Sequence, residues 1–386
     1  MRILIVGAGI AGLTLASLLK QRQIHADIID KAHGFGDVGY MIGLYSLGSS
    51  VLHGLNLYDD YISRTQRLTT YVPHDNDGNQ LKSFSLAEFT KRYGDYQCTT
   101  RYTLIEIIRQ AYGDLPVQFG TMVTTIEQLT DETIVTFSNG NSKSYDLVIG
   151  SDGINSQIRS LILEQNEYET FDTGWGGFVW WGDKAVVPAE TVYEFWGDKF
   201  FVGAYPTEEK TGLIIACKGH NAIEALQGKS RKEFLLDLCS PVVAKYPELF
   251  QELPADNVDM FYWGLKDVRC KVWHKGKVLL LGDAATAFLP TAGVGASMAM
   301  ESAAVLNDIL SRTDSRYLSN ALNVYDKRRR KRVESAQEDS RKLAKMMFVD
   351  SYIGSKARDI VFKFMVNHMD MQDFMKSIAN AMVTPA

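Results

Sequence analysis

The strongest constraint on the fold is a glycine-rich turn that separates an apolar run from a helical pattern. Residues 2–7 predict a strand, residues 10–22 a helix and residues 26–30 a second strand. Between the first strand and the helix, residues 7–12 follow the spacing G-x-G-x-x-G. This order, with an acidic residue closing the second strand, is the form of a dinucleotide-binding βαβ unit.

Each glycine of the turn has its own predicted role. Gly7 would permit the tight turn, Gly9 would let the backbone approach a pyrophosphate, and Gly12 would let the helix pack closely on the strand. The pyrophosphate would lie against the N–H groups at the start of the helix. Asp30 could accept a hydrogen bond from a ribose hydroxyl. The turn therefore predicts a bound nucleotide without deciding between NAD and FAD.

The composition limits the class of protein. The 386 residues are 46% hydrophobic and 23% charged, which suffices for a sizeable core in one very large domain or two intertwined ones. A net charge of −5 disfavours a non-specific nucleic-acid or anionic-membrane binder, and the basic run 327–332 predicts a solvated helix face. The four cysteines lack metal-site spacing and fit a reducing cytoplasm. No run of about 18 apolar residues occurs, so we expect no membrane span.

The chain changes character between its nucleotide-binding elements. Residues 171–264 are dense in aromatic side chains and broken by Gly, Pro and Asp, which predicts an antiparallel sheet. Residues 67–87 predict a hairpin, 117–149 a meander ending in a buried strand, and 230–245 a helix. We therefore expect an α/β protein with a discontinuous Rossmann-like domain (1–70, 95–170 and 265–350), an inserted antiparallel-sheet substrate domain (71–94 and 171–264) and a C-terminal helix (351–386).

Two later motifs extend the nucleotide site. Residues 146–159 combine a buried strand, a Gly–Asp–Gly turn at Asp152 and a helix start, which puts a carboxylate at the carboxyl end of a strand. The alternative is an Asx turn that caps the helix. Residues 282–297 lead from a strand through Asp283 and a proline loop into a second Gly-x-Gly turn. Asp283 could bind a ribityl or ribose hydroxyl, and the following helix start would stabilise the negative charge of a reduced flavin.

Together these motifs resemble the FAD-dependent aromatic hydroxylase family, the group A flavoprotein monooxygenases, which includes para-hydroxybenzoate hydroxylase and the tetracycline-inactivating monooxygenases. The resemblance covers most of the chain in the family's order and implies a GR2-type FAD-binding domain. Residues 100–104 resemble the family's arginine helix, 119–123 the segment that meets the adenine, and 39–43 the loop beside the flavin ring. The resemblance implies FAD contacts at Gly7, Gly9, Ile10, Ala11, Gly12, Asp30, Lys31, Met41, Gly43, Arg101, Val123, Asp152, Asp283, Pro290, Gly293, Val294, Gly295 and Ala296.

The chain departs from the family pattern at several positions. Thr286 replaces the usual histidine, and Glu301 replaces the usual helix aspartate. The usual Gly-Gln-Gly with a following Asn corresponds to Gly-Val-Gly-Ala-Ser at 293–297, and the usual acid–arginine pair to Asp30-Lys31. Since glycines and backbone N–H groups do the binding, the implied FAD site survives these changes.

The resemblance also implies a function, that of an FAD-dependent monooxygenase which consumes NAD(P)H and O₂. In the family's cycle NAD(P)H reduces the FAD, O₂ adds at C4a, and the hydroperoxide hydroxylates an electron-rich substrate. We therefore assign no catalytic side chain and no metal. The implied substrate is a flat, phenol- or enol-containing small molecule, aromatic or polyketide-like, so antibiotic modification is among the expected uses. We expect a monomer or homodimer with a substrate pocket formed by aromatic residues, unless these are sheet core: Trp175, Phe178, Trp181, Phe195 and Tyr205.

Three alternatives stay open at this point. A flavin oxidoreductase of the same architecture, a halogenase or a reductase, would not insert oxygen, although Trp180-Trp181 does not match the halogenase pattern Trp-x-Trp-x-x-Ile. An NAD-dependent dehydrogenase would leave the two later motifs without a purpose. A non-catalytic flavin- or ligand-binding module would have no flavin absorbance band that NAD(P)H bleaches. The C-terminal helix would bridge the two domains, cover the pocket or form a dimer face, and we favour bridging.

Overall fold

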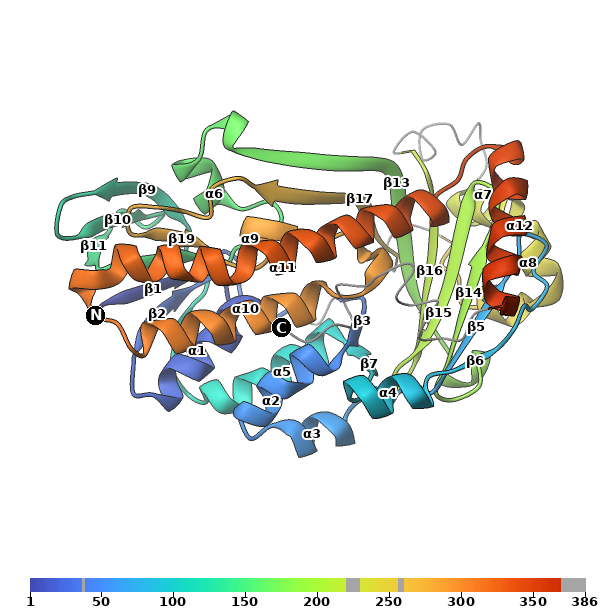
Figure 1. Ribbon diagram of the computed structural model, residues 1–386, viewed down its shortest axis with the longest axis horizontal. Helices are drawn as coiled ribbons and strands as arrows, with labels where there is room; N and C mark the ends of the chain where they lie inside the picture. The colour runs from blue at the N-terminus through green and yellow to red at the C-terminus, as the bar shows by residue number, and fades with distance from the viewer. Residues whose placement is uncertain (37–38, 220–229, 256–259, 369–386) are drawn as a thin grey trace.

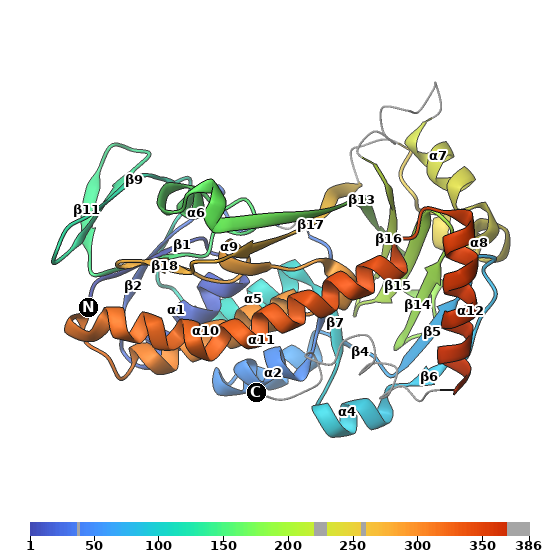
Figure 2. The ribbon, with the colours of Figure 1, turned by 45° about the horizontal axis from the view of Figure 1, so that its top comes forward.

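Two large sheets lie side by side and are joined by two long strands and one long helix (Figures 1 and 2). The computed structural model describes residues 1–36, 39–219, 230–255 and 260–368. One sheet is mostly parallel, and the other is mostly antiparallel. This arrangement confirms the predicted α/β class with a second, antiparallel sheet.

The mostly parallel sheet consists of β1 (Ile3–Val6), β2 (Ala26–Ile29), β8 (Val117–Gln118), β12 (Leu147–Gly150), β18 (His274–Lys275) and β19 (Val278–Leu280). Its strand order is β18-β19-β12-β1-β2-β8, with only β18 antiparallel to its neighbour. β1, β12 and β19 are apolar runs buried along their whole length, as expected where helices cover a parallel sheet. Since these strands come from distant parts of the chain, the nucleotide-binding fold is discontinuous.

Helices and two small sheets surround this core. α1 (Ile10–Gln21) packs against both α5 (Arg101–Tyr112) and α10 (Gly295–Leu310). The other elements on this side are α2 (Ser46–Gly54), α3 (Tyr58–Ser63), α6 (Gln157–Ile162), α9 (Asp283–Thr286), the sheet of β9 (Val123–Gln128), β10 (Thr133–Phe137) and β11 (Ser142–Tyr145), and the sheet of β3 (Met41–Leu44), β4 (Gln66–Arg67) and β7 (Gln97–Thr100).

The second large sheet consists of β5 (Thr70–His74), β6 (Phe84–Ser85), β13 (Tyr168–Gly182), β14 (Thr191–Trp196), β15 (Phe200–Pro206), β16 (Thr211–Lys218) and β17 (Phe261–Cys270). Its order is β17-β13-β16-β15-β14-β5-β6, with β14 and β5 parallel and the other pairs antiparallel. Helices α7 (Arg231–Leu238) and α8 (Ser240–Lys245) cover its outer face, while α4 (Ala87–Tyr93) follows β6. Short 3₁₀ turns lie at Gln165–Glu167, Lys184–Val186, Pro247–Phe250, Pro290–Ala292 and Ser315–Tyr317.

Strand alternation separates the aromatic residues of this sheet into two cores. On β14, Phe195 points to the outer face and packs with residues of α7 and α8, whereas Trp196 points to the inner face. The same alternation puts Phe200 on the outer face and Phe201 on the inner one. Only the inner face is turned toward the nucleotide-binding fold.

Helix α11 (Leu318–Met347) joins the two cores. Residues of its first half, such as Leu322 and Tyr325, pack in the core of the parallel sheet. Residues of its second half, such as Leu343 and Met347, pack in the inner core of the second sheet. The 30 residues of the helix span about 45 Å, and Figure 1 shows it running along both parts of the molecule.

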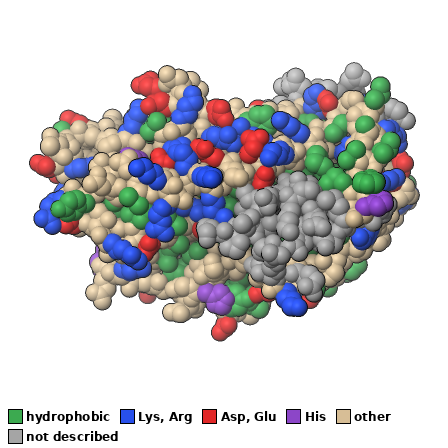
Figure 3. All heavy atoms as spheres, viewed as in Figure 1, with side chains coloured by type: hydrophobic (Ala, Val, Ile, Leu, Met, Phe, Trp, Pro, Cys, Tyr) green, Lys and Arg blue, Asp and Glu red, His purple; other side chains and the backbone are tan. Residues whose placement is uncertain are grey.

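The basic run on α11 is only partly the solvated face that the sequence predicts. Arg329 is 2% exposed, pairs with Glu301 at 2.9 Å and donates to Ser302. Arg330 bonds Asp326 on its own helix at 2.6 Å. Figure 3 shows acidic and basic side chains intermixed on the face that carries α11. Arg329 therefore holds α11 against α10 through its ion pair with Glu301, whereas Arg330 pairs within α11.

Helix α12 (Tyr352–His368) packs on the second sheet. Phe362 stacks on Trp196 with ring centroids 4.3 Å apart, and Arg358 donates to the backbone oxygens of Trp196 and Gly197. Within the described residues, α10, α11 and β17 contribute to both large cores, whereas α12 contributes only to the inner core of the second sheet. Residues 369–386 of the predicted C-terminal helix lie outside the described residues. None of the helices in the described part of the chain combines the length and the apolar character needed to cross a bilayer.

The structure confirms two local predictions, a hairpin and a meander, and contradicts a third, a single helix. The hairpin at 67–87 and the meander at 117–149 are confirmed by the pairings of β5 with β6 and of β9, β10 and β11. The single helix predicted at 230–245 is wrong, because the chain breaks into α7 and α8 at Ser240-Pro241, where the proline lies in the first turn of α8.

Candidate cofactor and substrate site

A cavity of about 950 Å³ lies between the carboxyl ends of the parallel strands and the inner face of the second sheet. Its volume is at the upper end of the range for ligand pockets. One part of its lining comes from the glycine turn and the starts of α1, α5 and α10, and another from aromatic side chains of β5, β14 and β15. The cavity thus connects the predicted nucleotide site to an aromatic chamber.

The three glycines of the first turn differ in what surrounds them. Gly7 has φ +106°, and a Cβ there would lie 2.4 Å from the Ser151 oxygen. A Cβ on Gly12 would lie 2.0 Å from the Gly7 oxygen, so this glycine lets α1 pack on the strand. A Cβ on Gly9 would meet no described atom closer than Arg101 Nη2, at 3.9 Å. The space at Gly9 is therefore left open toward the cavity, as a closely approaching ligand requires.

The start of α1 is suited to an anion. Gly9, Ile10 and Ala11 line the cavity, and among the described residues no acidic side chain lies in the first turn and no side chain caps it. The free N–H groups and the helix dipole therefore favour negative charge there. Asp30 accepts hydrogen bonds from the N–H groups of Ala8 and Ala32, each at 2.8 Å, and so fixes the turn against the second strand.

Asp152 is bonded mainly to its own helix. Its carboxylate accepts hydrogen bonds from the N–H groups of Gln157 at 2.7 Å and Ile158 at 3.1 Å, and from the Ser156 hydroxyl. These hydrogen bonds agree with the alternative that Asp152 forms a turn that caps the following helix. The residue nevertheless lines the cavity.

Asp283, Arg101 and Tyr40 form a group of polar side chains around the middle of the cavity. The Asp283 side chain is exposed to the cavity, yet desolvation by the surrounding protein raises its pKa to about 6, against an opposing effect of Arg101. Burial, and then Asp283, raise the pKa of Tyr40, which stays a protonated donor. A hydroxyl-rich ligand could bond to both Asp283 and Tyr40.

A second unblocked helix start faces the same cavity. Gly293 has φ +64°, and Gly293, Gly295 and Ala296 line the cavity at the beginning of α10. As far as the described residues show, α10 has neither a side-chain cap nor an acid in its first turn. Val294 points the other way and is 1% exposed in the inner core. This helix start therefore offers a positive potential through its backbone alone.

Most residues predicted to bind the cofactor line this one cavity: Gly7, Gly9, Ile10, Ala11, Asp30, Lys31, Met41, Gly43, Arg101, Val123, Asp152, Asp283, Pro290, Gly293, Gly295 and Ala296. Gly12 and Val294 are described but do not line it. Gly12 serves the packing of α1, and Val294 packs in the inner core. Residues far apart in sequence are thus brought together around a single elongated space.

The predicted substrate pocket requires correction. Of its five aromatic residues only Tyr205 lines the cavity. Phe178 and Phe195 lie in the outer core, because strand alternation turns them away. Trp175 is on the inner side but stacks on Phe348, with centroids 4.9 Å apart, and Phe348 lines the cavity instead. Trp181 lies near the end of β13 and does not line the cavity either.

Several chamber residues were missed by the sequence reasoning. They are mostly aromatic, with one carboxylate among them: Tyr45, Tyr71, Phe89, Tyr96, Glu194, Trp196, Phe201, Trp263, Phe288, Met347 and Phe348. The alternation Val192–Glu194–Trp196 along β14 was the available signal, because it puts a charged residue on the same face as two apolar ones. The other residues lie on separate segments that only the fold brings together.

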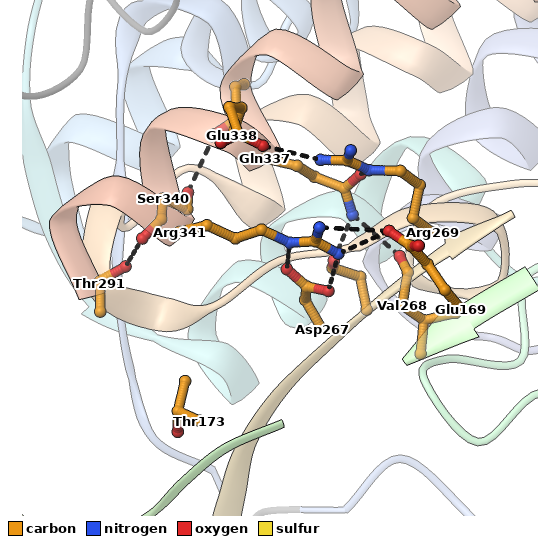
Figure 4. Close-up of polar contacts among 12 residues, drawn as sticks. Glu169, Thr173, Asp267, Val268, Arg269, Thr291, Gln337, Glu338, Ser340 and Arg341 are labelled. Atoms are coloured by element: carbon orange, nitrogen blue, oxygen red, sulfur yellow. Dashed lines mark hydrogen bonds and ion pairs between the residues drawn. The ribbon is translucent and has the colours of Figure 1, made fainter. Parts of the chain in front are cut away.

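The loop between α9 and α10, which lines the cavity, is fastened to α11 by polar contacts (Figure 4). Gln337 donates to the Ala287 oxygen at 2.7 Å and to the Val268 oxygen at 2.9 Å. Thr291 donates to the Ser340 oxygen at 2.9 Å. One helix therefore fixes both the loop and β17.

The same contact region contains a buried ion pair. Asp267 is fully buried and accepts two hydrogen bonds from the Arg341 guanidinium, each at 2.8 Å. Arg341 also reaches Glu169 at 3.1 Å on the neighbouring strand, as Figure 4 shows. The carboxylate raises the pKa of Arg341, which keeps the cation charged.

Fold and site together define a nucleotide-binding flavoprotein whose second sheet faces the cofactor site. The sequence profile described as the FAD binding domain matches residues 1–340. The chain belongs to this family, and the resemblance to the group A flavoprotein monooxygenases is confirmed.

Three comparisons illustrate the relationship. A flavin-dependent monooxygenase from an unknown prokaryotic organism is 26% identical over 334 residues, 82% of each chain. The FAD-dependent urate hydroxylase of Klebsiella pneumoniae subsp. pneumoniae is 28% identical over 358 residues, 89% of each chain. The structure of a variant of Klebsiella pneumoniae HpxO complexed with FAD superimposes with a TM-score of 0.87 at 23% identity, covering 100% of this chain and 99% of that one. The structural likeness supports the fold, and the sequence relatives are flavin-dependent oxygenases.

Proposed function

We propose that this FAD-dependent monooxygenase oxidises NADH or NADPH and hydroxylates an electron-rich aromatic or enolic small molecule. The observation that carries the proposal is a continuous cavity. It connects the N-termini of α1 and α10, which have neither a side-chain cap nor an acidic residue in the first turn, to an aromatic chamber. The relatives named monooxygenase and urate hydroxylase support the same reaction class.

The residues that line the cavity fit FAD. The open side of Gly9 and the free N–H groups of α1 would hold the pyrophosphate. Arg101 and Asp283 would bond the middle of the cofactor, and the start of α10 would stabilise negative charge on the flavin. When bound, FAD would supply the transfer of electrons from NAD(P)H to O₂ and of one oxygen atom to the substrate.

The chain's own part in the reaction is to position the substrate and exclude water. The aromatic rings of Tyr45, Phe89, Tyr96 and Phe201 give the chamber apolar walls. Such walls favour a flat substrate and keep bulk water away from reactive oxygen species. None of the described side chains has to act as a general base in this scheme.

The test is turnover by the FAD-loaded protein. Oxidation of NADH and of NADPH is followed with a panel of phenols and enols under ¹⁸O₂. We expect at least one compound to accelerate flavin reduction and to gain one ¹⁸O atom. NAD(P)H oxidation that yields only hydrogen peroxide would favour a flavin oxidoreductase without oxygen insertion. A flavin band that NAD(P)H never bleaches would contradict the proposal altogether.

A further inference from the structure

Glu194 is the one acidic residue described on the aromatic side of the cavity that does not belong to the nucleotide-binding fold. It lies on β14, half-buried, with its side chain on the inner face between Val192 and Trp196. Its Oε2 accepts hydrogen bonds from Tyr71 at 2.8 Å and from Trp196 Nε1 at 3.1 Å. Its Oε1 accepts one from Tyr205 at 2.7 Å.

All of these donors are neutral. Burial first, and then the charge of Glu194, raise the pKa of Tyr71 and of Tyr205 well above the ordinary value. Both hydroxyls therefore stay protonated and donate to the carboxylate over the whole physiological pH range. The network orients the negative charge of Glu194 without neutralising it.

No cation compensates this charge within the described part of the chain. The ion pairs found there do not involve Glu194. Lys266 lines the cavity from β17, which is four strand positions from β14 in the sheet, or about 19 Å at the usual spacing. Lys31 and Arg101 belong to the nucleotide-binding part. Since charges that are partly removed from water are normally stabilised by a cation or by hydrogen bonds, this half-buried carboxylate, which has only neutral donors, has capacity for a cationic partner.

The acceptor geometry agrees with this reading. A carboxylate oxygen can accept about two hydrogen bonds. Oε2 already accepts two, whereas Oε1 accepts only the one from Tyr205 among the described residues. Oε1 can therefore accept one more hydrogen bond, and the Glu194 side chain that carries it lines the cavity. The surrounding aromatic rings also favour a cation over a neutral group.

We propose that Glu194 is a specificity-determining residue that binds a protonated amine of the substrate. The inference rests on the proposed function, because it takes the aromatic chamber as the substrate site. It adds a chemical class, namely a flat phenol or enol that carries a basic nitrogen away from the ring to be hydroxylated. The rival explanation is that Glu194 only ties β5, β14 and β15 together through its hydrogen bonds.

The experiment compares three phenols on the FAD-loaded full chain, followed by perturbation of the flavin absorbance. The probes share one ring and differ in one substituent: 4-(2-aminoethyl)phenol, 4-(2-hydroxyethyl)phenol and 4-hydroxyphenylacetate. We expect the wild-type protein to bind the amine about 10-fold to 100-fold more tightly than the alcohol, as a hydrogen bond between charged groups allows. The carboxylate should bind most weakly.

Two variants separate anchoring from structure. Glu194→Gln keeps the shape of the side chain and should abolish the preference for the amine while leaving affinity for the alcohol nearly unchanged. Glu208→Gln is the matched control, because Glu208 is exposed in the turn between β15 and β16 and pairs only loosely with Lys184, at 3.4 Å. It removes the same charge and should keep the preference. If Glu194→Gln does not fold, Tyr205→Phe serves instead, since it leaves the carboxylate in place and should retain the preference.

Each possible binding result either supports or overturns the proposed role of Glu194. An amine preference that persists in Glu194→Gln, or is lost in Tyr205→Phe, overturns the proposal. So does equal affinity of the wild-type protein for amine and alcohol, stronger binding of the carboxylate, or failure of the amine to bind at millimolar concentration. These binding results are independent of ¹⁸O incorporation, so failure of the anchoring role and failure of the monooxygenase reaction are told apart.

Discussion

Two glycines of one turn, Gly9 and Gly12, should respond in opposite ways to the same substitution by alanine. A Cβ on Gly12 would lie 2.0 Å from the Gly7 oxygen and 2.7 Å from Ser151 Oγ, so α1 would have to move off its strand. Such overpacking costs about 3 kcal/mol, of which better helix propensity returns about 1 kcal/mol. Gly12→Ala should therefore lower the unfolding free energy of the apoprotein by about 2 kcal/mol.

Gly9→Ala should leave the apoprotein nearly as stable as the wild type. Gly9 has φ −81° and ψ −170°, which alanine adopts without strain, and the added methyl group would have Arg101 Nη2 as its nearest described neighbour, at 3.9 Å. The methyl group would instead occupy space needed by the pyrophosphate. A comparable misfit weakens FAD binding by about 100-fold.

Urea unfolding with and without FAD measures both effects. At an FAD concentration of about 100 times the wild-type Kd, the cofactor stabilises the wild type by about 2.7 kcal/mol and Gly9→Ala by only about 0.4 kcal/mol. Flavin fluorescence titration gives the two Kd values directly. Unchanged FAD affinity in Gly9→Ala, or unchanged apoprotein stability in Gly12→Ala, would refute the division of roles between the two glycines.

Three further predictions concern charged groups. The folded-state pKa of Asp283 is about 6, above its ordinary value of 3.8, so the folded apoprotein binds this proton more tightly than the unfolded chain. The apoprotein should therefore gain stability as the pH falls from about 6 to about 4. In urea unfolding curves measured over a pH series, Asp283→Asn should remove this gain. Arg101→Met removes the cation that lowers this pKa, so the same rise should begin at higher pH. Arg341→Met leaves the fully buried Asp267 unpaired and should cost about 3–5 kcal/mol in urea unfolding, most of it recovered in the double variant with Asp267→Leu, and a loss below about 1 kcal/mol would contradict the argument.

The nucleotide half of the site was predictable because local sequence determines it. The turn at Gly7, Gly9 and Gly12 works through backbone geometry, so its spacing alone identifies it. Asp30, Asp152 and Asp283 follow apolar strands, and the carboxyl ends of parallel strands meet at one edge of a sheet. Their convergence on one cavity follows from that rule.

The substrate half was not predictable in the same way. Apart from the polar first half of β13 and several glycines, most positions of β13 to β16 are apolar or aromatic, because both faces of this sheet are covered. Composition therefore cannot tell Phe195, in the outer core, from Trp196, beside the cavity. Residues such as Tyr45 and Phe348 reach the chamber from outside the sheet, and no sequence period connects them to it.

The length and fastening of α11 have a mechanical consequence for the cavity. One half of the helix packs in the core of the parallel sheet, and the other in the inner core of the second sheet. Gln337 and Arg341 bond it to β17 at the passage between them. Bending a continuous helix breaks backbone hydrogen bonds, so α11 acts as a rigid spacer that sets the width of the cavity. We therefore expect the cavity to keep a nearly constant width and to accept ligands according to their thickness.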